Sequence, residues 1–131
     1  MSAVAAVQAA MVAALRGDAT VAATASGVFD GPPARAAFPY VAIGETLARD
    51  WSAKGMTGRE LNLAVIAWDE GGRAARLHAL AAAAEAAIEG MARELDGWRI
   101  VSLVFVRSRV VRDPRGPWAA IIEFRARAVA G

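Results

Sequence analysis

Few side chains of this 131-residue chain could do acid–base, nucleophilic or metal chemistry. The sequence holds one histidine, His78, and no cysteine. Histidine is the usual general base and the commonest metal ligand, and thiolates are the main soft nucleophiles and soft-metal ligands. The composition therefore argues against catalytic triads, histidine-clustered metal sites and disulfide scaffolds. We expect His78 to be a half-buried structural residue on a helix.

Two adjacent carboxylates, Asp69-Glu70, are followed by Gly71-Gly72. Such a pair could hold a metal or act as a general acid, but a loop cap before two glycines is the more typical role. The glycines, with Arg73 and Arg76 after them, could also present backbone N–H groups to an anion at a helix start. Motifs for phosphate loops, dinucleotide folds, nucleophile elbows and two-histidine zinc sites are absent. We predict no catalytic residue, no cofactor and no metal, and hence no enzyme.

The densest basic run near the end of the chain has two interpretations. It forms an electrostatic patch for a phosphate backbone or an acidic partner, or it consists of solvent-facing strand and turn residues. Fifteen basic residues against 13 acidic ones give a net charge of +2, which is too small to indicate a nucleic-acid binder. The run comprises Arg107, Arg109, Arg112 and Arg115.

A second candidate surface lies in a polar, glycine-containing stretch around Trp51. Exposed aromatic side chains often mark protein interfaces, so Trp51 either packs on a partner or folds back on its own sheet. Together the two stretches supply the predicted interface residues, which are Arg49, Trp51, Lys54, Met56, Arg59, Arg107, Arg109, Arg112 and Arg115.

The last third of the chain predicts an antiparallel hairpin that would position the basic run. Two β-rich stretches, 97–109 and 118–127, meet at a turn containing Pro114 and Gly116. In the second stretch, apolar and charged residues alternate as in a strand with one face exposed to solvent. We expect Trp118 to be a core residue as well, and the large side chains predicted to fill the core are Trp68, Trp98, Phe105, Ile122 and Phe124.

Periodicity elsewhere predicts the remaining elements. Helical spacing runs to Arg16, with one more turn over 18–25, and a second apolar stripe runs from Leu77 to Leu95 before Asp96-Gly97. Strands are expected at 27–30, 39–47 and 59–68, the last two paired as a hairpin with a mobile tip. The order α-β-β-β-α-β-β predicts an α+β fold, with an antiparallel sheet of about four to five strands and two packed helices. We expect one domain, residues 1–131, and no segment spans a bilayer.

The chain resembles the tail-completion, or tail-terminator, proteins of long-tailed phages and of phage-derived gene transfer agents. Four stretches carry the resemblance best: 15–18 (Leu-Arg-Gly-Asp), 28–33 (Val-Phe-Asp-Gly-Pro-Pro), 38–41 (Phe-Pro-Tyr-Val) and 61–68. It continues through the alanine-rich helix to 97–101 and the closing 124–127. The Pro-Tyr-Val after a proline-containing loop is its most specific piece.

The resemblance implies a structural protein without catalysis. It implies a homo-oligomeric ring, typically six-fold, at the head-proximal end of a tail tube. Such a ring ends tube polymerisation and presents a docking surface to the head connector or stopper protein. The implied partners are further copies of the chain, the major tail tube protein and the connector, with DNA passing through the ring without sequence-specific binding. The implied location is the neck of a virion or phage-like particle, assembled in the bacterial cytoplasm.

Two other functions remain open from the residues alone. The arginine-bearing hairpin could serve a nucleic-acid-binding module, whose DNA affinity would depend steeply on salt. A pocket between helix and sheet could serve a small enzyme or ligand-binding domain, although the single histidine argues against most enzymes.

Overall fold

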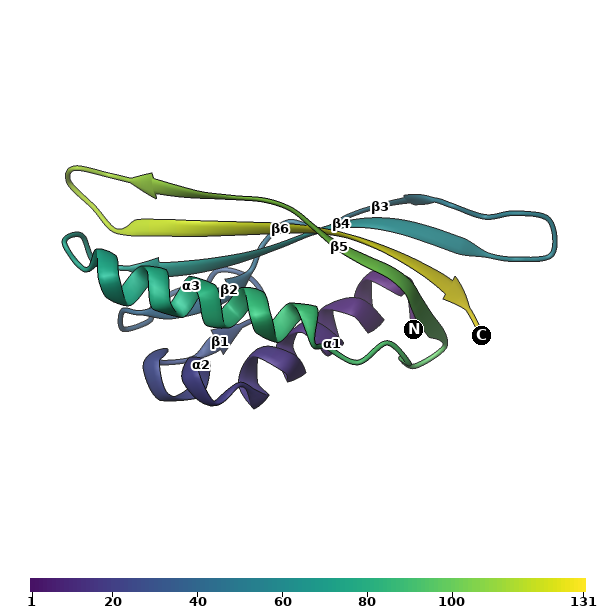
Figure 1. Ribbon diagram of the computed structural model, residues 1–131, viewed down its shortest axis with the longest axis horizontal. Coiled ribbons are helices and arrows are strands. Elements are labelled where there is room, and N and C mark those ends of the chain that lie inside the picture. Colours follow the sequence, from purple (N-terminus) through teal and green to yellow (C-terminus); the bar gives the residue numbers. More distant parts are fainter.

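Six strands form one twisted sheet, and three helices cover one of its faces (Figure 1). The computed structural model describes residues 1–131. None of the helices combines the length and apolar composition needed to cross a membrane. In chain order the elements are α1 (Ala3–Gly17), α2 (Ala19–Thr24), β1 (Val28–Phe29), β2 (Tyr40–Ile43), β3 (Leu47–Asp50), β4 (Gly58–Asp69), α3 (Ala74–Glu89), β5 (Trp98–Arg112) and β6 (Trp118–Ala130).

The strand order is β1-β2-β4-β6-β5, and β3 pairs with β4 further along the edge that β2 occupies. All neighbours are antiparallel except β1 and β2, which are parallel. The α+β class and the C-terminal hairpin are therefore confirmed. The prediction of an antiparallel sheet of about four to five strands with two packed helices holds only in part, because the sheet has six strands with one parallel pair and three helices cover it.

Two local features explain the different strand count. The proline-containing loop between Phe29 and Tyr40 carries the chain back to the same end of the sheet, which makes β1 and β2 parallel. The strand predicted at 39–47 divides after Ile43. At Gly44 the backbone runs so close to β4 that an added Cβ would lie 3.0 Å from the Cβ of Ala64. The chain resumes pairing with β4 at Leu47.

The core lies between the helices and the sheet and contains 22 buried residues. The N-terminal apolar spacing becomes the buried stripe of α1, and Ser2 caps this helix by accepting the N–H of Ala5 at 3.1 Å. Asp18 caps α2 in the same way through the N–H of Val21, at 3.0 Å. The helices contribute Val7, Met11, Leu15, Leu77, Leu80 and Ile88, and the strands contribute Leu61, Leu63, Val65, Ile122 and Phe124.

The central helix is shorter than predicted. It ends at Glu89, with Gly90 as its C-cap, whereas the apolar stripe continues to Leu95. Met91 is buried outside the helix, because residues after Gly90 turn back and bond to the start of β5. The apolar spacing between Met91 and Leu95 therefore indicated buried residues but not a continuing helix. His78 is exposed on α3, so its predicted half-burial was wrong.

Burial of the predicted large core residues differs along the sheet. Ile122 and Phe124 are buried, and Trp68, Trp98 and Trp118 are half-buried. Phe105 is 45% exposed, so its assignment to the core was wrong. Phe105 lies on β5, at the edge of the sheet, while α3 packs chiefly over β4 and β6.

Candidate functional site

The predicted interface residues form two groups at opposite ends of the molecule. The β3–β4 hairpin carries the group around Trp51, and β5 with its following turn carries the four-arginine run. In Figure 1 the tip of the β3–β4 hairpin points to one side, and the turn between β5 and β6 points to the other. The structure does not bring the two groups together into one site.

The β3–β4 hairpin is held by contacts within itself. Nη1 of Arg59 lies 3.4 Å from Oδ1 of Asp50, and the Ser52 hydroxyl donates to the same oxygen at 2.6 Å. The Ser52 hydrogen bond is the main reason that the pKa of Asp50 lies below its usual value. Met56 is half-buried and Lys54 is exposed at the tip. Arg59 therefore has a structural role, and Lys54 is the free charge of this group.

Trp51 folds back on its own sheet, which was one of its two possible roles. Its side chain is half-buried, and the guanidinium of Arg127 lies 5.1 Å from the ring centroid. Such a contact is a cation–π interaction between β6 and the base of the hairpin. Trp51 thus fixes the direction of the hairpin.

A cluster of arginines around Glu60, on the sheet face opposite the helices, was not found from the sequence. The Glu60 carboxylate lies 3.0 Å from Nε of Arg127, 3.7 Å from Nε of Arg49 and 4.0 Å from Nε of Arg125. Nε of Arg125 is buried without a hydrogen-bond partner. Three guanidinium groups against one carboxylate leave an excess of positive charge on this face. The cluster depends on the register of β3, β4 and β6, which no local pattern encodes.

The arginine run on β5 is partly engaged within the chain. Arg107 forms a close ion pair with Glu123, and their mutual hydrogen bond raises the pKa of Arg107 and lowers that of Glu123. The guanidinium of Arg112 lies 5.0 Å from the Trp118 ring. Arg109 and Arg115 are exposed and form no ion pair. These two arginines are the free charges of this group.

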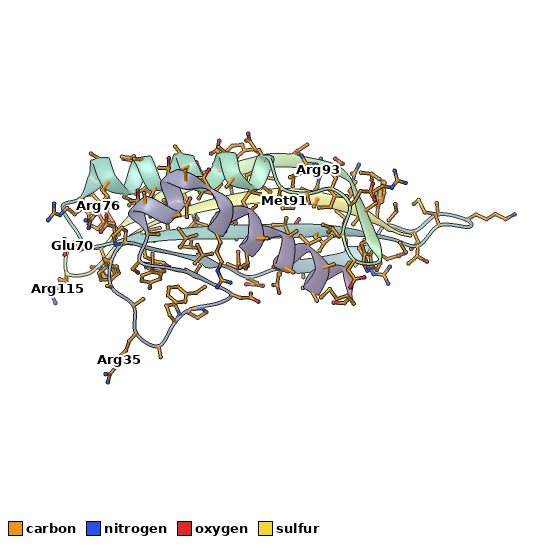
Figure 2. The ribbon with its side chains drawn as sticks, turned by 90° about the horizontal axis from the view of Figure 1, so that it is seen from below. Arg35, Glu70, Arg76, Met91, Arg93 and Arg115 are labelled. Atoms are coloured by element: carbon orange, nitrogen blue, oxygen red, sulfur yellow. The ribbon has the colours of Figure 1, made fainter.

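Asp69 is a structural ion-pair partner. Its carboxylate is fully buried and accepts Nε of Arg76 at 2.7 Å and Nη2 of Arg76 at 2.6 Å. Burial disfavours the carboxylate, but these bonds and the N–H of Glu70 outweigh it, so the pKa of Asp69 is lowered. Arg73 pairs with Glu70 at 3.1 Å, so both arginines of the predicted anion site are occupied. Arg76, Glu70 and Arg115 share one end of the molecule (Figure 2).

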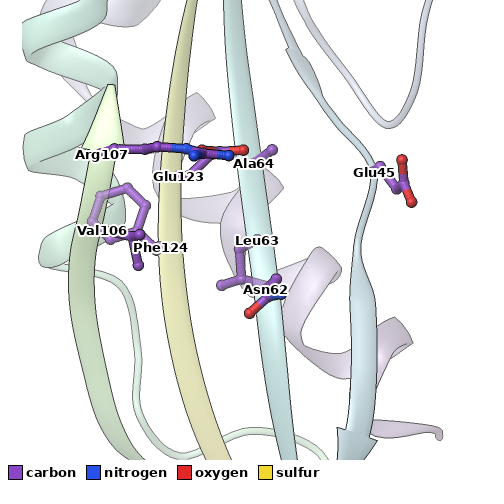
Figure 3. Close-up of a pocket in the computed structure, with 8 residues that line it drawn as sticks. All are labelled: Glu45, Asn62, Leu63, Ala64, Val106, Arg107, Glu123 and Phe124. Atoms are coloured by element: carbon purple, nitrogen blue, oxygen red, sulfur yellow. The ribbon is translucent and has the colours of Figure 1, made fainter. Parts of the chain in front are cut away.

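Two hollows open on the molecule. One, of about 160 Å³, crosses the sheet from Glu45 to Arg107, which reaches over β6 to Glu123 (Figure 3). The other, of about 390 Å³, lies beside Gly31 and Pro32 against Ile66 and Trp68. Neither is lined by a nucleophile beside a base, and no three acidic, histidine or cysteine residues cluster as metal ligands do.

The outer edge of β5, which we call the β5 edge, is an apolar feature that the sequence did not reveal. β5 has 15 residues and pairs with β6 on one side; on its other side only its first three residues bond, to residues 93–95, so from Val101 onward this side presents unpaired backbone groups. Two register shifts, at Val101 and Val106, interrupt the pairing with β6. Exposed large apolar side chains concentrate here, at 38–53% exposure: Val101, Val104, Phe105, Val106, Val110 and Val111.

Comparison with known proteins relates the chain to one protein family and to solved structures. The family model described as "Tail completion protein gp17" matches residues 9–128. Among solved structures, the chain is similar to a chain of the "Virion of native gene transfer agent (GTA) particle", with 29% sequence identity and a TM-score of 0.80. That alignment covers 99% of this chain and 98% of the other. No curated protein matches the chain.

Proposed function

This chain belongs to the tail completion protein family, and from that premise we propose that it completes a phage-like tail as a structural subunit. Several copies form a ring, six-fold in symmetry, at the head-proximal end of the tail tube. The ring ends polymerisation of the major tail tube protein and presents a docking surface to the head connector or stopper protein. DNA passes through it without sequence-specific binding.

The β5 edge is the observation that supports an assembly role best. A long, unpaired, apolar edge strand promotes unwanted association in a protein that works alone. In a subunit, the same surface is available for burial against a neighbour. Six half-exposed apolar side chains on one 15-residue strand therefore favour a chain that is completed by a partner.

The polar groups support the same proposal, because those that might do chemistry are engaged in structural contacts. Asp69 is bonded to Arg76, Glu70 to Arg73, and Glu123 to Arg107. Ending a tube and docking a connector require complementary surfaces and no reactive side chain. We propose that this protein is not an enzyme.

The two hairpin ends provide candidate contacts with the neighbours of the ring. Lys54 and Arg115 lie at the two tips, which point in opposite directions (Figure 1). A ring between a tube and a connector also needs two opposed faces. We propose that one tip contacts the tube protein and the other contacts the connector, with Arg49 and Met56 beside Lys54, and Arg109 and Arg112 beside Arg115.

Deletion of the gene from the genome that encodes the particle tests this function. Electron microscopy of the particles is expected to show tubes of uncontrolled length and heads without attached tails. Expression of the wild-type chain from a plasmid should restore both tube length and joining. Particles with normal tails joined to heads in the deletion strain would overturn the proposal.

A further inference from the structure

We propose that the β5 edge of one copy docks against the opposite margin of the sheet in a second copy, so that subunits join head to tail. This inference rests on the proposed ring and names the surfaces that form it. The opposite margin, called here the β3 margin, consists of β3 and the Gly44–Thr46 connection before it, together with Asp30 and Phe38 of the β1–β2 loop, which lies on the same side of the sheet.

The β5 edge is both apolar and cationic. Besides its six exposed apolar side chains, β5 carries Arg99, Arg107, Arg109 and Arg112 and no acidic residue. Only Arg107 forms an ion pair within the chain. A partner that fits this edge must offer apolar side chains together with unpaired carboxylates.

The β3 margin has that composition. Apart from Met1, the only exposed large apolar side chains outside β5 are Phe38, at 40% exposure, and Leu47, at 51%. Asp30 and Glu45 are exposed carboxylates that form no ion pair. The side of β3 that faces away from β4 is unpaired. The same chain therefore carries both halves of a complementary contact, on opposite margins of one sheet.

Head-to-tail contact fits these charges better than contact between two β5 edges. Pairing two β5 edges brings together eight arginines, four from each copy, with no acidic residue on either strand. Joining the β5 edge to the β3 margin places free arginines such as Arg109 near Glu45. Because this contact uses two different surfaces, its repetition generates a ring when the rotation closes. The bulges at Val101 and Val106 interrupt regular pairing, so we expect side-chain packing to hold the contact.

Cysteine cross-linking tests the arrangement cleanly, because the chain has no cysteine of its own. Val106→Cys labels the β5 edge and Leu47→Cys labels the β3 margin. With a flexible bis-maleimide, an equal mixture of the two variants should give cross-linked dimers, and each variant alone should give none above background. Ala82→Cys, on the exposed face of α3, measures that background. Both cysteines in one chain should give a ladder of higher oligomers.

Either of two results overturns the inference. Dimers from Val106→Cys alone would indicate contact between two β5 edges, and a mixture without cross-links would exclude the β3 margin as the partner. These outcomes differ from failure of the proposed function, which is a deletion strain with normal, joined tails. Rings at tail ends without cross-linking between these two surfaces would exclude this docking mode and leave the proposed function intact.

A charge exchange provides an independent test. Arg109→Glu and Glu45→Arg should each weaken self-association about tenfold or more, as measured by analytical ultracentrifugation (sedimentation) of the purified chain. The double variant, with both changes in one chain, should recover most of the wild-type association. Thermal unfolding should show that each single variant folds as the wild type does. If the double variant loses as much free energy of self-association as the two single variants together, these two charges are not in direct contact.

Discussion

Phe105 and Phe124 are register partners on adjacent strands, and their ring centroids lie 6.0 Å apart with the planes at 85°. Phe124 is 1% exposed, whereas Phe105 is 45% exposed. The helices cover β6 and leave most of β5 open, so one edge-to-face aromatic pair crosses the boundary between the core and the surface. This boundary separates residues needed for folding from residues available for assembly.

The pair predicts two very different costs of truncation. Phe124→Ala should lower the free energy of unfolding by about 3–5 kcal/mol, because it empties a buried site. Phe105→Ala should lower it by less than about 1.5 kcal/mol, since it removes one aromatic contact and little buried area. Urea denaturation followed by circular dichroism measures both. Equal losses would mean that Phe105 belongs to the core of the isolated chain.

Two glycine substitutions should have different effects on stability. At Gly58 an added Cβ would lie 2.5 Å from the backbone oxygen of Trp51, so Gly58→Ala must shift the base of the β3–β4 hairpin. We expect it to lower the free energy of unfolding by about 1–3 kcal/mol. At Gly17, the last residue of α1, nothing lies within 4 Å of that position. Gly17→Ala should be neutral or raise stability by up to about 1 kcal/mol.

Thermal unfolding of the two variants beside the wild type checks this pair. A midpoint for Gly58→Ala at or above the wild-type value contradicts the close approach between Gly58 and Trp51. A midpoint for Gly17→Ala below the wild-type value contradicts the open surroundings of Gly17.

The elements of this fold could be predicted where the local pattern is strong. The alternation from Trp118 to Phe124 predicted a strand, and the stripe from Leu77 to Ile88 predicted a helix, because each element buries one face of its own. The parallel pairing of β1 with β2 could not be predicted in this way. It depends on where a loop returns the chain, and periodicity reports only which face of an element is buried.

The contacts that the candidate surface residues make within the chain could not be predicted, for a related reason. Side-chain type suggested Trp51 and the arginines, but their roles depend on partners distant in sequence, such as Arg127 for Trp51 and Glu123 for Arg107. The β5 edge was missed because an apolar strand looks the same in sequence whether a helix covers it or not. Phe105 shows this directly.

Asp69 should couple stability to acid pH. Burial raises the pKa of this carboxyl, but the bonds from Arg76 and from the N–H of Glu70 hold it below the ordinary value of 3.8. A carboxyl whose pKa is lower in the folded state stabilises the fold above its unfolded-state pKa. That contribution is lost as the pH falls below about 4 and through the folded-state pKa. Asp69→Asn should therefore reduce stability at neutral pH and make the acid-side decline shallower.

Urea denaturation over a series of acid pH values measures this effect. The decline should persist in part, because the pKa values of Asp50 and Glu123 are also lowered in the folded state. An acid-side slope in Asp69→Asn identical to that of the wild type would show that the buried pair does not contribute to the pH dependence.

Binding to DNA should be weak, and its salt dependence should be much less steep than that of a dedicated nucleic-acid-binding protein. Arg107 is paired with Glu123 and Arg112 lies over Trp118, so Arg99, Arg109 and Arg115 are the arginines near β5 that make neither kind of contact. Each phosphate contact steepens the plot of log affinity against log salt by about 0.9, so three contacts give a slope near −3 at most. Fluorescence anisotropy of a labelled duplex at several salt concentrations measures the slope. A slope near −6 or steeper, reduced by the double change Arg109→Gln and Arg115→Gln, would favour the nucleic-acid-binding alternative. A shallow slope fits a ring through which DNA passes without being held.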